Sequence, residues 1–328
     1  MSFFNDIKID FEQKAAGANT QNNQATQAQK EDSNSIFDSK PESTGIDSAM
    51  DMAIRMDNTN NTKDGKIGHT KQGAIGCCGL DAAVVAMSST EVGAEILDSA
   101  FEYFSYEATR LHTYLGDQTV YDRNLKKYTR SNAISKGDDD MGIIELGLQD
   151  TVDDILKGKY KISKDAPLEL KYLKTQDLTN YREQTSSIEG IYPNAVFYLL
   201  TGKEGEYYSH KKAMNSKLDE FQDNNHKDLA MTAVTNFEDG YMGVVQQTGQ
   251  VEEFKDVLDV EKNKKVSLSA DHAFSVQEVT DDAVTLINPW DTAKSVTISR
   301  DDFLSNFYIM CCDLSENNPE KAYIKEAK

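Results

Sequence analysis

The chain has 328 residues, enough for one large domain or two modest ones. Its formal charge of -20 at pH 7 repels nucleic acid and anionic membranes, so we expect neither as a partner. Apolar residues make up 38% of the chain, and no apolar run reaches the roughly 18–20 residues that span a bilayer.

The four cysteines stand in two adjacent pairs, Cys77–Cys78 and Cys311–Cys312. This arrangement is typical neither of a disulfide framework nor of a zinc site, which uses C-x-x-C spacing. The first ten residues have neither the basic nor the apolar region of a secretory signal. We therefore expect free thiols and a cytoplasmic protein, although export by another route would leave no trace in the sequence.

Residues 1–64 are rich in Asn, Gln, Ser, Thr, Asp and Lys, and their composition predicts a disordered arm. A short helix is compatible with the spacing of apolar residues over Ile46–Met56. The arm could be a tether or a removable pro-segment. The string from Asn60 to Lys71 is similar to a calcium-binding EF-hand loop, but Lys71 stands where a bidentate Glu is required, which favours a plain turn.

Residues 65–190 are predicted to form a helical lobe. An Ala-rich helix is expected over Cys78–Met87, a long helix over Glu91–Leu115 and a third over Met141–Leu156, from the spacing of their apolar residues.

Residues 191–313 are predicted to form a β-rich lobe, followed by a tail over 314–328. A helix is expected over Tyr208–Phe221. Short strands are expected over Asn194–Leu200, Ala230–Phe237, Met242–Gln247, His272–Val279, Ala283–Asn288, Ser295–Ile298 and Phe307–Asp313. A helical lobe followed by a β-rich lobe is an α+β arrangement, and a site between such lobes is common.

Cys78 stands where the Gly-containing segment QGAIGC runs into the Ala-rich helix. The positive end of the helix dipole favours a thiolate, which is the nucleophilic form of cysteine. Gln72 precedes Cys78 by six positions and could donate its amide to a substrate oxyanion. Cys77 is the rival nucleophile, because adjacent helical residues point about 100° apart and only one can face a cleft.

A nucleophilic thiol needs a base, and His272 is the strongest candidate among the five histidines. It opens an alternating strand, and Asn288 follows in the next strand. A two-residue turn at Asp281–Asp282 would join these strands as a hairpin and bring His272 beside Asn288. The Asn288 amide oxygen could then orient the imidazole, and Trp290 could shield that hydrogen bond or simply pack in the core.

Three segments resemble motifs of the calpain family of cysteine peptidases. The run from Gln72 to Cys78 is similar to the calpain loop Q-G-x-[LI]-G-x-C. The segment DHAFSV from Asp271 is similar to G-H-A-[YF]-S-V, and Asn288-Pro289-Trp290 matches N-P-W. Weaker similarity is found at Leu200–Gly202 and over 137–146. The resemblance spans about residues 65–313, with its motifs in family order.

The resemblance implies a papain-like two-lobe fold and a cysteine endopeptidase acting on protein or peptide substrates. Cys78 would attack, His272 would carry the proton, Asn288 would orient His272, and Gln72 would stabilise the oxyanion. No cofactor is required. Calcium activates calpains, but the short stretch after Asp313 leaves no room for their regulatory domains, so calcium dependence is not carried over. No metal site is expected.

The sequence departs from the family pattern at three positions. Gly79 replaces the usual Trp, while Asp271 and Asp291 replace glycines. The two carboxylates could raise the pKa of His272, or they could be solvated. Two other functions stay open: an acyltransferase or amidase on the same fold, and a non-catalytic binding protein.

Overall fold

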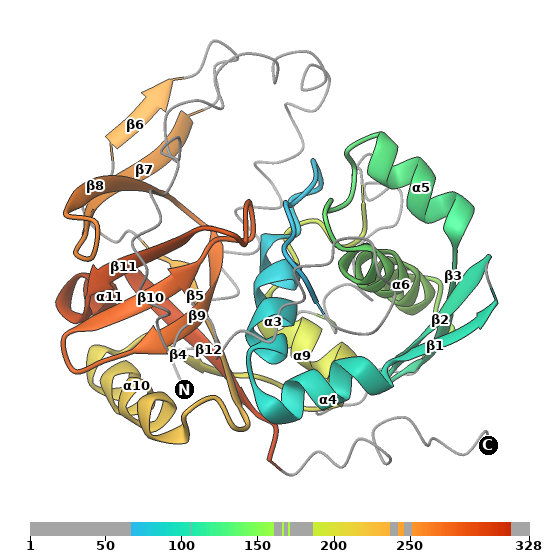
Figure 1. Cartoon of the computed structure of the whole chain (residues 1–328), viewed down its shortest axis with the longest axis horizontal. Coiled ribbons are helices and arrows are strands. Elements are labelled where there is room, and N and C mark those ends of the chain that lie inside the picture. Colours follow the sequence, from blue (N-terminus) through green and yellow to red (C-terminus); the bar gives the residue numbers. More distant parts are fainter. Residues whose placement is uncertain are drawn as a thin grey trace, which may run out of the picture.

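The computed structural model describes residues 67–105, 107–160, 166, 170, 186–236, 242–245 and 251–315. The described chain is a mixed α+β structure, with most helices in its first half and most strands in its second (Figure 1). The predicted N-terminal arm and its short helix, most of the calcium-like string and most of the C-terminal tail lie outside the described residues.

The first half contains the helices expected around Cys78 and Met141. Side chains cap two of the helix starts: Thr90 accepts a hydrogen bond from Gly93 N–H, and Asp138 accepts one from Asp140 N–H. Among the residues that the structure describes, no helix has both the length and the apolar character needed to cross a membrane. The helices of this half are α3 (Cys78–Ser88), α4 (Glu91–Ser99), α5 (Asp122–Arg130), α6 (Asp139–Leu156) and α9 (Pro193–Thr201).

The long helix predicted over Glu91–Leu115 is wrong after Ser99. The chain there forms an antiparallel sheet of β1 (Phe101–Ser105), β2 (Ala108–Thr113) and β3 (Gly116–Tyr121). The few apolar residues of this stretch fit a helical period, but its Phe, Tyr, Thr and Val residues favour strands. The β2–β3 turn closes through a hydrogen bond between Thr113 Oγ1 and the Gly116 carbonyl oxygen at 2.6 Å.

The strand predicted over Asn194–Leu200 is also wrong, because this segment is helix α9. Pro193 begins the helix, and Gly202 ends it in a left-handed conformation with φ 79°. The residues between are nearly all buried, so the apolar run has no amphipathic period. A short buried helix and a buried strand cannot be told apart by periodicity.

The second half of the described chain holds a six-stranded sheet in the order β11-β10-β9-β5-β12-β4 and a three-stranded sheet in the order β6-β7-β8. Strands predicted at Ala230, Met242, His272, Ala283, Ser295 and Phe307 are confirmed within a few residues, whereas β7, β8 and α11 were not predicted. The elements are β4 (Glu206–Tyr208), α10 (Lys211–Asn224), β5 (Leu229–Thr235), β6 (Met242–Val245), β7 (Val251–Asp259), β8 (Lys264–Ser269), β9 (Ala273–Val279), β10 (Ala283–Ile287), β11 (Ser295–Ser299), α11 (Arg300–Asn306) and β12 (Phe307–Asp313).

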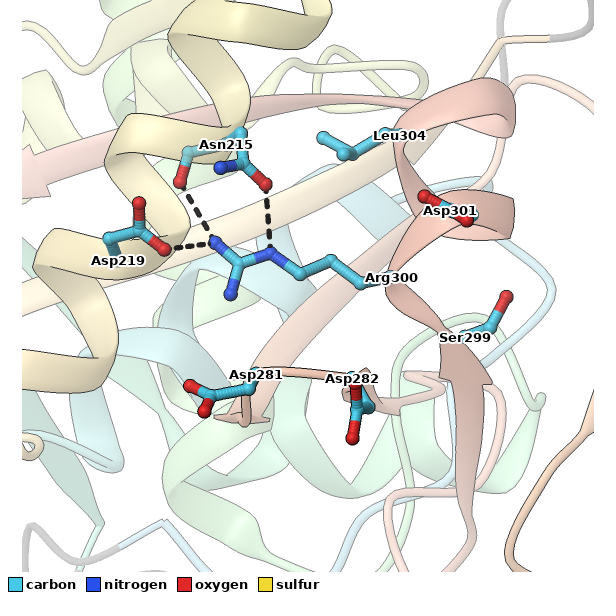
Figure 2. A pocket seen from close by; sticks show the side chains of 8 residues that line it. All are labelled: Asn215, Asp219, Asp281, Asp282, Ser299, Arg300, Asp301 and Leu304. Carbon is cyan, nitrogen blue, oxygen red and sulfur yellow. Dashed lines mark hydrogen bonds and ion pairs between the residues drawn. The ribbon is translucent and has the colours of Figure 1, made fainter.

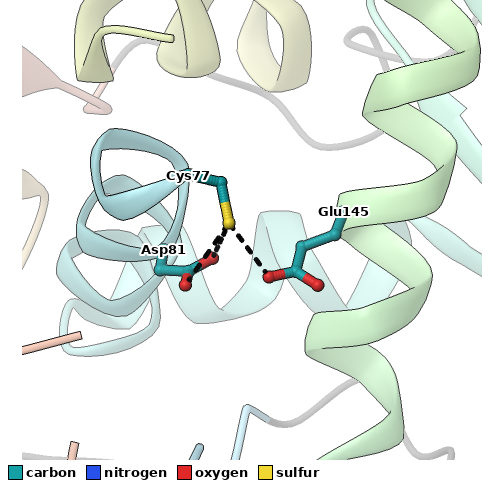
Figure 3. A group of neighbouring side chains, drawn as sticks. All are labelled: Cys77, Asp81 and Glu145. Carbon is teal, nitrogen blue, oxygen red and sulfur yellow. Dashed lines mark hydrogen bonds between the residues drawn. The ribbon is translucent and has the colours of Figure 1, made fainter. Parts of the chain in front are cut away.

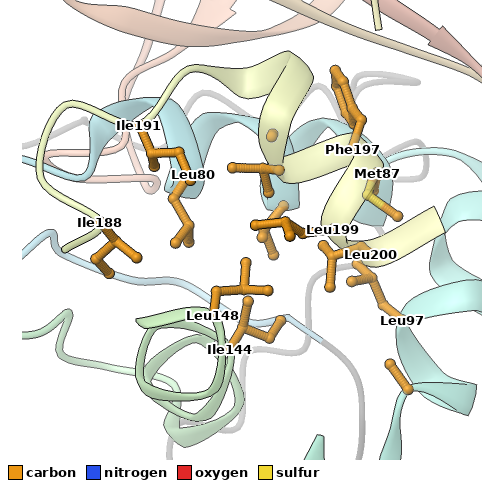
Figure 4. Packing of buried hydrophobic residues seen from close by; sticks show 14 of the residues in the cluster. Leu80, Met87, Leu97, Ile144, Leu148, Ile188, Ile191, Phe197, Leu199 and Leu200 are labelled. Atoms are coloured by element: carbon orange, nitrogen blue, oxygen red, sulfur yellow. The ribbon is translucent and has the colours of Figure 1, made fainter. Parts of the chain in front are cut away.

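Buried apolar side chains form two main clusters. The first joins α3, α6 and α9, and Figure 4 shows Leu80, Leu148 and Leu199 meeting in it. The second lies against the six-stranded sheet and includes Phe274 and Phe303. Helix α9 packs in the first cluster, although its residues fall within the predicted β-rich lobe.

Helix α3 lies where the two halves of the chain meet. It contacts α6 and α9 on one side and strands β5 and β9 on the other (Figure 1). A small third cluster fills the contact with the strands, formed by Ala82, Val234 and Ala273 with Cys78 and Tyr308 packed against it. Small side chains allow α3 and β9 to approach closely, and this contact positions the candidate site.

Candidate active site

The two adjacent cysteines face opposite halves of the molecule. Cys77, the residue before α3, is fully buried among the helices, and its sulfur lies 3.3 Å from Glu145 Oε1. Cys78 is partly exposed and packs against the strand side, beside Ala273. Of the two rival nucleophiles, only Cys78 therefore faces the strand that follows His272.

Backbone N–H groups surround the Cys78 sulfur. Burial raises the pKa of the thiol, while hydrogen bonds from the N–H groups of Ala273, Gly79 and Cys78 itself oppose that rise. The N–H groups at the helix start thus lower the pKa of the thiol, as expected. Burial raises this pKa by more, so Cys78 is a neutral thiol in this structure. The bond from Ala273 N–H places the sulfur next to the residue that follows His272.

The side chains of His272 and Asn288 are in direct contact. His272 Nε2 lies 2.9 Å from Asn288 Oδ1, and the same oxygen accepts the Trp290 N–H at 3.0 Å. A backbone N–H can only donate, so this side-chain atom must be the amide oxygen. His272 therefore carries its proton on Nε2, which leaves Nδ1 as the basic nitrogen.

Aromatic rings enclose the imidazole on two sides. The His272 ring centroid lies 4.3 Å from that of Trp290 and 4.8 Å from that of Phe274. Trp290 is itself 46% exposed, so it covers the His272–Asn288 hydrogen bond rather than filling a core. The shielding role expected for Trp290 fits this position, because shielding from water strengthens a hydrogen bond.

An irregularity in β9 places His272 and Asn288 on the same face. Next to the turn, Thr285 of β10 pairs with Glu278 of β9. The next residue of β10, Leu286, pairs with Val276 and not with Gln277. Gln277 is thus an extra residue on β9. Without it, the continued register would send His272 and Asn288 to opposite faces, because a slip of one residue flips every side chain.

The resting His272 is neutral, contrary to one option left open by the sequence. Burial lowers its pKa to about 4, and the hydrogen bond to Asn288 opposes this only in part. Asp291 forms ion pairs with two lysines, and its Oδ2 atom lies 3.5 Å from Lys71 Nζ and 3.4 Å from Lys294 Nζ. Asp271 adopts φ 51°, a left-handed conformation that glycine adopts more readily.

This burial predicts a pH-dependent stability. His272 has an ordinary pKa of 6.5 when unfolded and about 4 when folded, so its contribution is complete above 6.5 and is lost as the pH falls towards 4. The loss between pH 8 and pH 4 is about 3 kcal/mol of unfolding free energy. Urea unfolding of wild type and His272→Gln at both pH values measures it as a difference, and equal pH dependence in the two proteins would contradict the prediction.

The Gln72 segment is bound directly to the Asn-Pro-Trp segment, a contact that sequence reasoning missed. Gln72 N–H donates to the Pro289 carbonyl oxygen at 3.1 Å, and Thr70 N–H donates to Thr292 Oγ1 at 2.7 Å. The Gln72 amide donates one N–H to the Ile75 carbonyl oxygen at 2.9 Å. The amide oxygen of Gln72 is buried and has no hydrogen-bond partner among the described residues, and the oxyanion role of this side chain stays a prediction.

The space beside the nucleophile explains why Gly79 replaces the Trp of the calpain pattern. A Cβ atom on Gly79 would lie 2.0 Å from the Ile191 carbonyl oxygen and 3.2 Å from the Pro193 ring. The segment that leads into α9 thus occupies the volume that a larger side chain would need.

A hollow of about 420 Å³ opens elsewhere, between α10 and α11. Arg300 crosses it and binds Asn215 and Asp219, with an Nε to Oδ1 distance of 2.9 Å to Asn215 (Figure 2). Its rim also carries Asp281, Asp282 and Asp301. None of the residues predicted for the site lines this hollow.

Sequence reasoning also missed a buried group of acidic and thiol side chains next to Cys78. Cys77, Asp81 and Glu145 converge from the start of α3 and from α6, and one potential ligand atom of each lies within 4.8 Å of those of the other two (Figure 3). An i, i+4 pair of Cys77 and Asp81 on one helix face was the available signal. Glu145 lies far from this pair in the chain, so the sequence could not predict it as the third member of the group.

The comparisons with known proteins identify no relative. No protein-family model matches this chain. No curated protein matches it either.

Proposed function

We propose that this chain is a papain-like, two-lobe cysteine endopeptidase that hydrolyses peptide bonds of protein or peptide substrates. The observation that carries the proposal is the arrangement around His272. Asn288 fixes the tautomer of His272 through a 2.9 Å hydrogen bond. The backbone N–H of Ala273, the residue after His272, donates a hydrogen bond to the Cys78 sulfur. The proposal assigns the roles of nucleophile, base and orienting group to residues that are far apart in the sequence.

In the proposed reaction, the Cys78 sulfur attacks the scissile carbonyl carbon while its proton passes to His272 Nδ1. The second N–H of Gln72 binds the resulting oxyanion. His272 then protonates the amine, which leaves, and an acyl-thioester remains on Cys78. Water attacks the thioester with His272 as the base, which releases the carboxylic acid and restores the thiol.

The neutral resting pair fits this sequence of steps. Burial raises the pKa of Cys78 and lowers that of His272, so the proton moves only as the sulfur attacks. No cofactor takes part in the proposed reaction. The four cysteines are free thiols, which fits the cytoplasmic location that we include in the proposal.

The test is incubation of the full chain with a mixed peptide library, with and without calcium, followed by mass spectrometry of the products. We expect internal cleavage that does not require calcium and stops when a thiol-directed alkylating reagent labels Cys78. Added amine nucleophiles test the transferase alternative. Products that carry the amine, with no free acid, would replace hydrolysis by acyl transfer. Unchanged peptides despite labelled Cys78 would favour a binding protein.

A further inference from the structure

Two carboxyl groups lie buried beside the nucleophile without a cation. Asp81 and Glu145 are both fully buried, and the ion pairs of the described residues include neither of them. Burial and their mutual repulsion make the charged pair costly, so the two groups share a proton. Burial raises the pKa of both carboxyls.

The hydrogen-bond donors show which group keeps the charge. Glu145 Oε2 accepts Ser135 N–H at 2.8 Å, and its Oε1 accepts the Ser135 hydroxyl at 2.7 Å and the Cys77 thiol at 3.3 Å. Asp81 lies further from the Ser135 hydroxyl, at 3.2 Å, and from the Cys77 sulfur, at 3.7 Å. Glu145 is therefore the carboxylate, and Asp81 is protonated and donates to it.

Through these bonds Glu145 reaches both ends of the loop that carries Gln72. Cys77 immediately precedes the nucleophile. Ser135 belongs to a segment paired with the start of the loop, where Lys71 N–H donates to the Lys136 carbonyl oxygen at 2.7 Å. Gly73 allows the close approach, because a Cβ there would lie 2.5 Å from the Ala133 oxygen. One buried carboxylate thus connects the nucleophile, the oxyanion loop and the segment beneath them.

We propose that Glu145 is a positioning residue of the peptidase site, whose carboxylate holds the Gln72 loop and the start of α3 in the geometry that Cys78 needs. This inference rests on the proposed function, because it names a residue that supports the same reaction. Glu145 touches neither substrate nor the reacting atoms. It acts through Cys77 and Ser135.

The test compares Glu145→Gln with Asp81→Asn. Glutamine replaces one carboxylate oxygen of Glu145 by an NH2 group. This group faces the donors of Ser135 and Cys77, so we expect the loop that carries Gln72 to shift. We expect kcat to fall about 100-fold with little change in KM, since displacement by about 1 Å can cost that much. Asparagine mimics the protonated Asp81, so we expect a loss of less than about tenfold, which is 1.4 kcal/mol.

A second measurement keeps the inference separate from the peptidase proposal and from folding. The alkylation rate of Cys78 by iodoacetamide is measured in folded wild type, Glu145→Gln, Asp81→Asn and Leu148→Ala, the last a core variant of the same helix. The inference requires a rate change in Glu145→Gln that Leu148→Ala does not share. If wild type cleaves no peptide, the peptidase proposal fails while these rates still decide the role of Glu145.

Four results would overturn the inference. Equal losses of kcat in Glu145→Gln and Asp81→Asn would show that the proton is not held on Asp81. Equal changes in Glu145→Gln and Leu148→Ala would leave Glu145 with a merely structural role. Should Glu145→Gln fail to fold, Ser135→Ala, which removes one donor, takes its place and must slow kcat. Stoichiometric zinc in wild type that is lost with Glu145 would mean that a metal, not a proton, balances the two carboxyls.

Discussion

Replacement of Cys78 by Ala is expected to abolish peptide cleavage, whereas replacement of Cys77 by Ser is expected to change it by less than about tenfold. Only Cys78 is partly exposed and packs beside Ala273, and only its sulfur can reach a substrate held against the strands. Cys77 is sealed among the helices, 3.3 Å from Glu145, and Ser keeps a donor for that contact.

The measurement is kcat/KM on a peptide found in the library, with near-ultraviolet circular dichroism to show that each variant is folded. Cys312→Ser serves as a matched control, because Cys312 is a buried free thiol on β12, distant in role from the site. Activity that is lost with Cys77 and kept without Cys78 would reverse the assignment of the nucleophile and remove the basis of the proposal.

Replacement of His272 by Ala is expected to lower kcat/KM by about 10²–10⁴-fold, the usual contribution of a general base. The thiol is neutral in this structure because burial raises its pKa, so it depends on Nδ1 to take its proton. Asn288→Ala is expected to lower kcat/KM by less than His272→Ala does, because the imidazole stays but no longer has a fixed tautomer.

Steady-state kinetics of both variants check this order. Asp281→Asn is the matched control: Asp281 stands in the turn of the same hairpin, where it contacts Gln222 and not the imidazole. We expect this control to retain wild-type activity. A His272→Ala enzyme that cleaves as fast as wild type would refute the role of His272, and an Asn288→Ala loss greater than that of His272→Ala would refute the role given to Asn288.

Much of the chemistry could be read from local sequence. A thiol at a helix start, a histidine that opens an alternating strand and an Asn-Pro-Trp segment are local patterns. The structure places Cys78 at a helix start as predicted, while His272 and Asn288 each lie one residue outside the strands that were predicted to include them. The Asp281–Asp282 turn is confirmed as well, since Thr280 and Ala283 close it with a 2.9 Å hydrogen bond. Turn residues and strand periodicity are short-range signals, which is why these predictions hold.

Other features depend on contacts between distant segments. The helix predicted beyond Ser99 is a sheet because β1, β2 and β3 pair with one another, and the strand predicted at Asn194 is a helix because it is buried in the first cluster. The shift at Gln277, which puts His272 and Asn288 on one face, appears only in the register of β9 and β10.

The sequence by itself therefore determined the set of candidate reactive groups and the types of many of the elements that carry them. The tertiary structure alone decided which cysteine faces the strands, which nitrogen of His272 is basic, and that Glu145 lies beneath the nucleophile. The physical reason is that burial and hydrogen-bond partners set charge and orientation, and both depend on what packs against a residue from other parts of the chain.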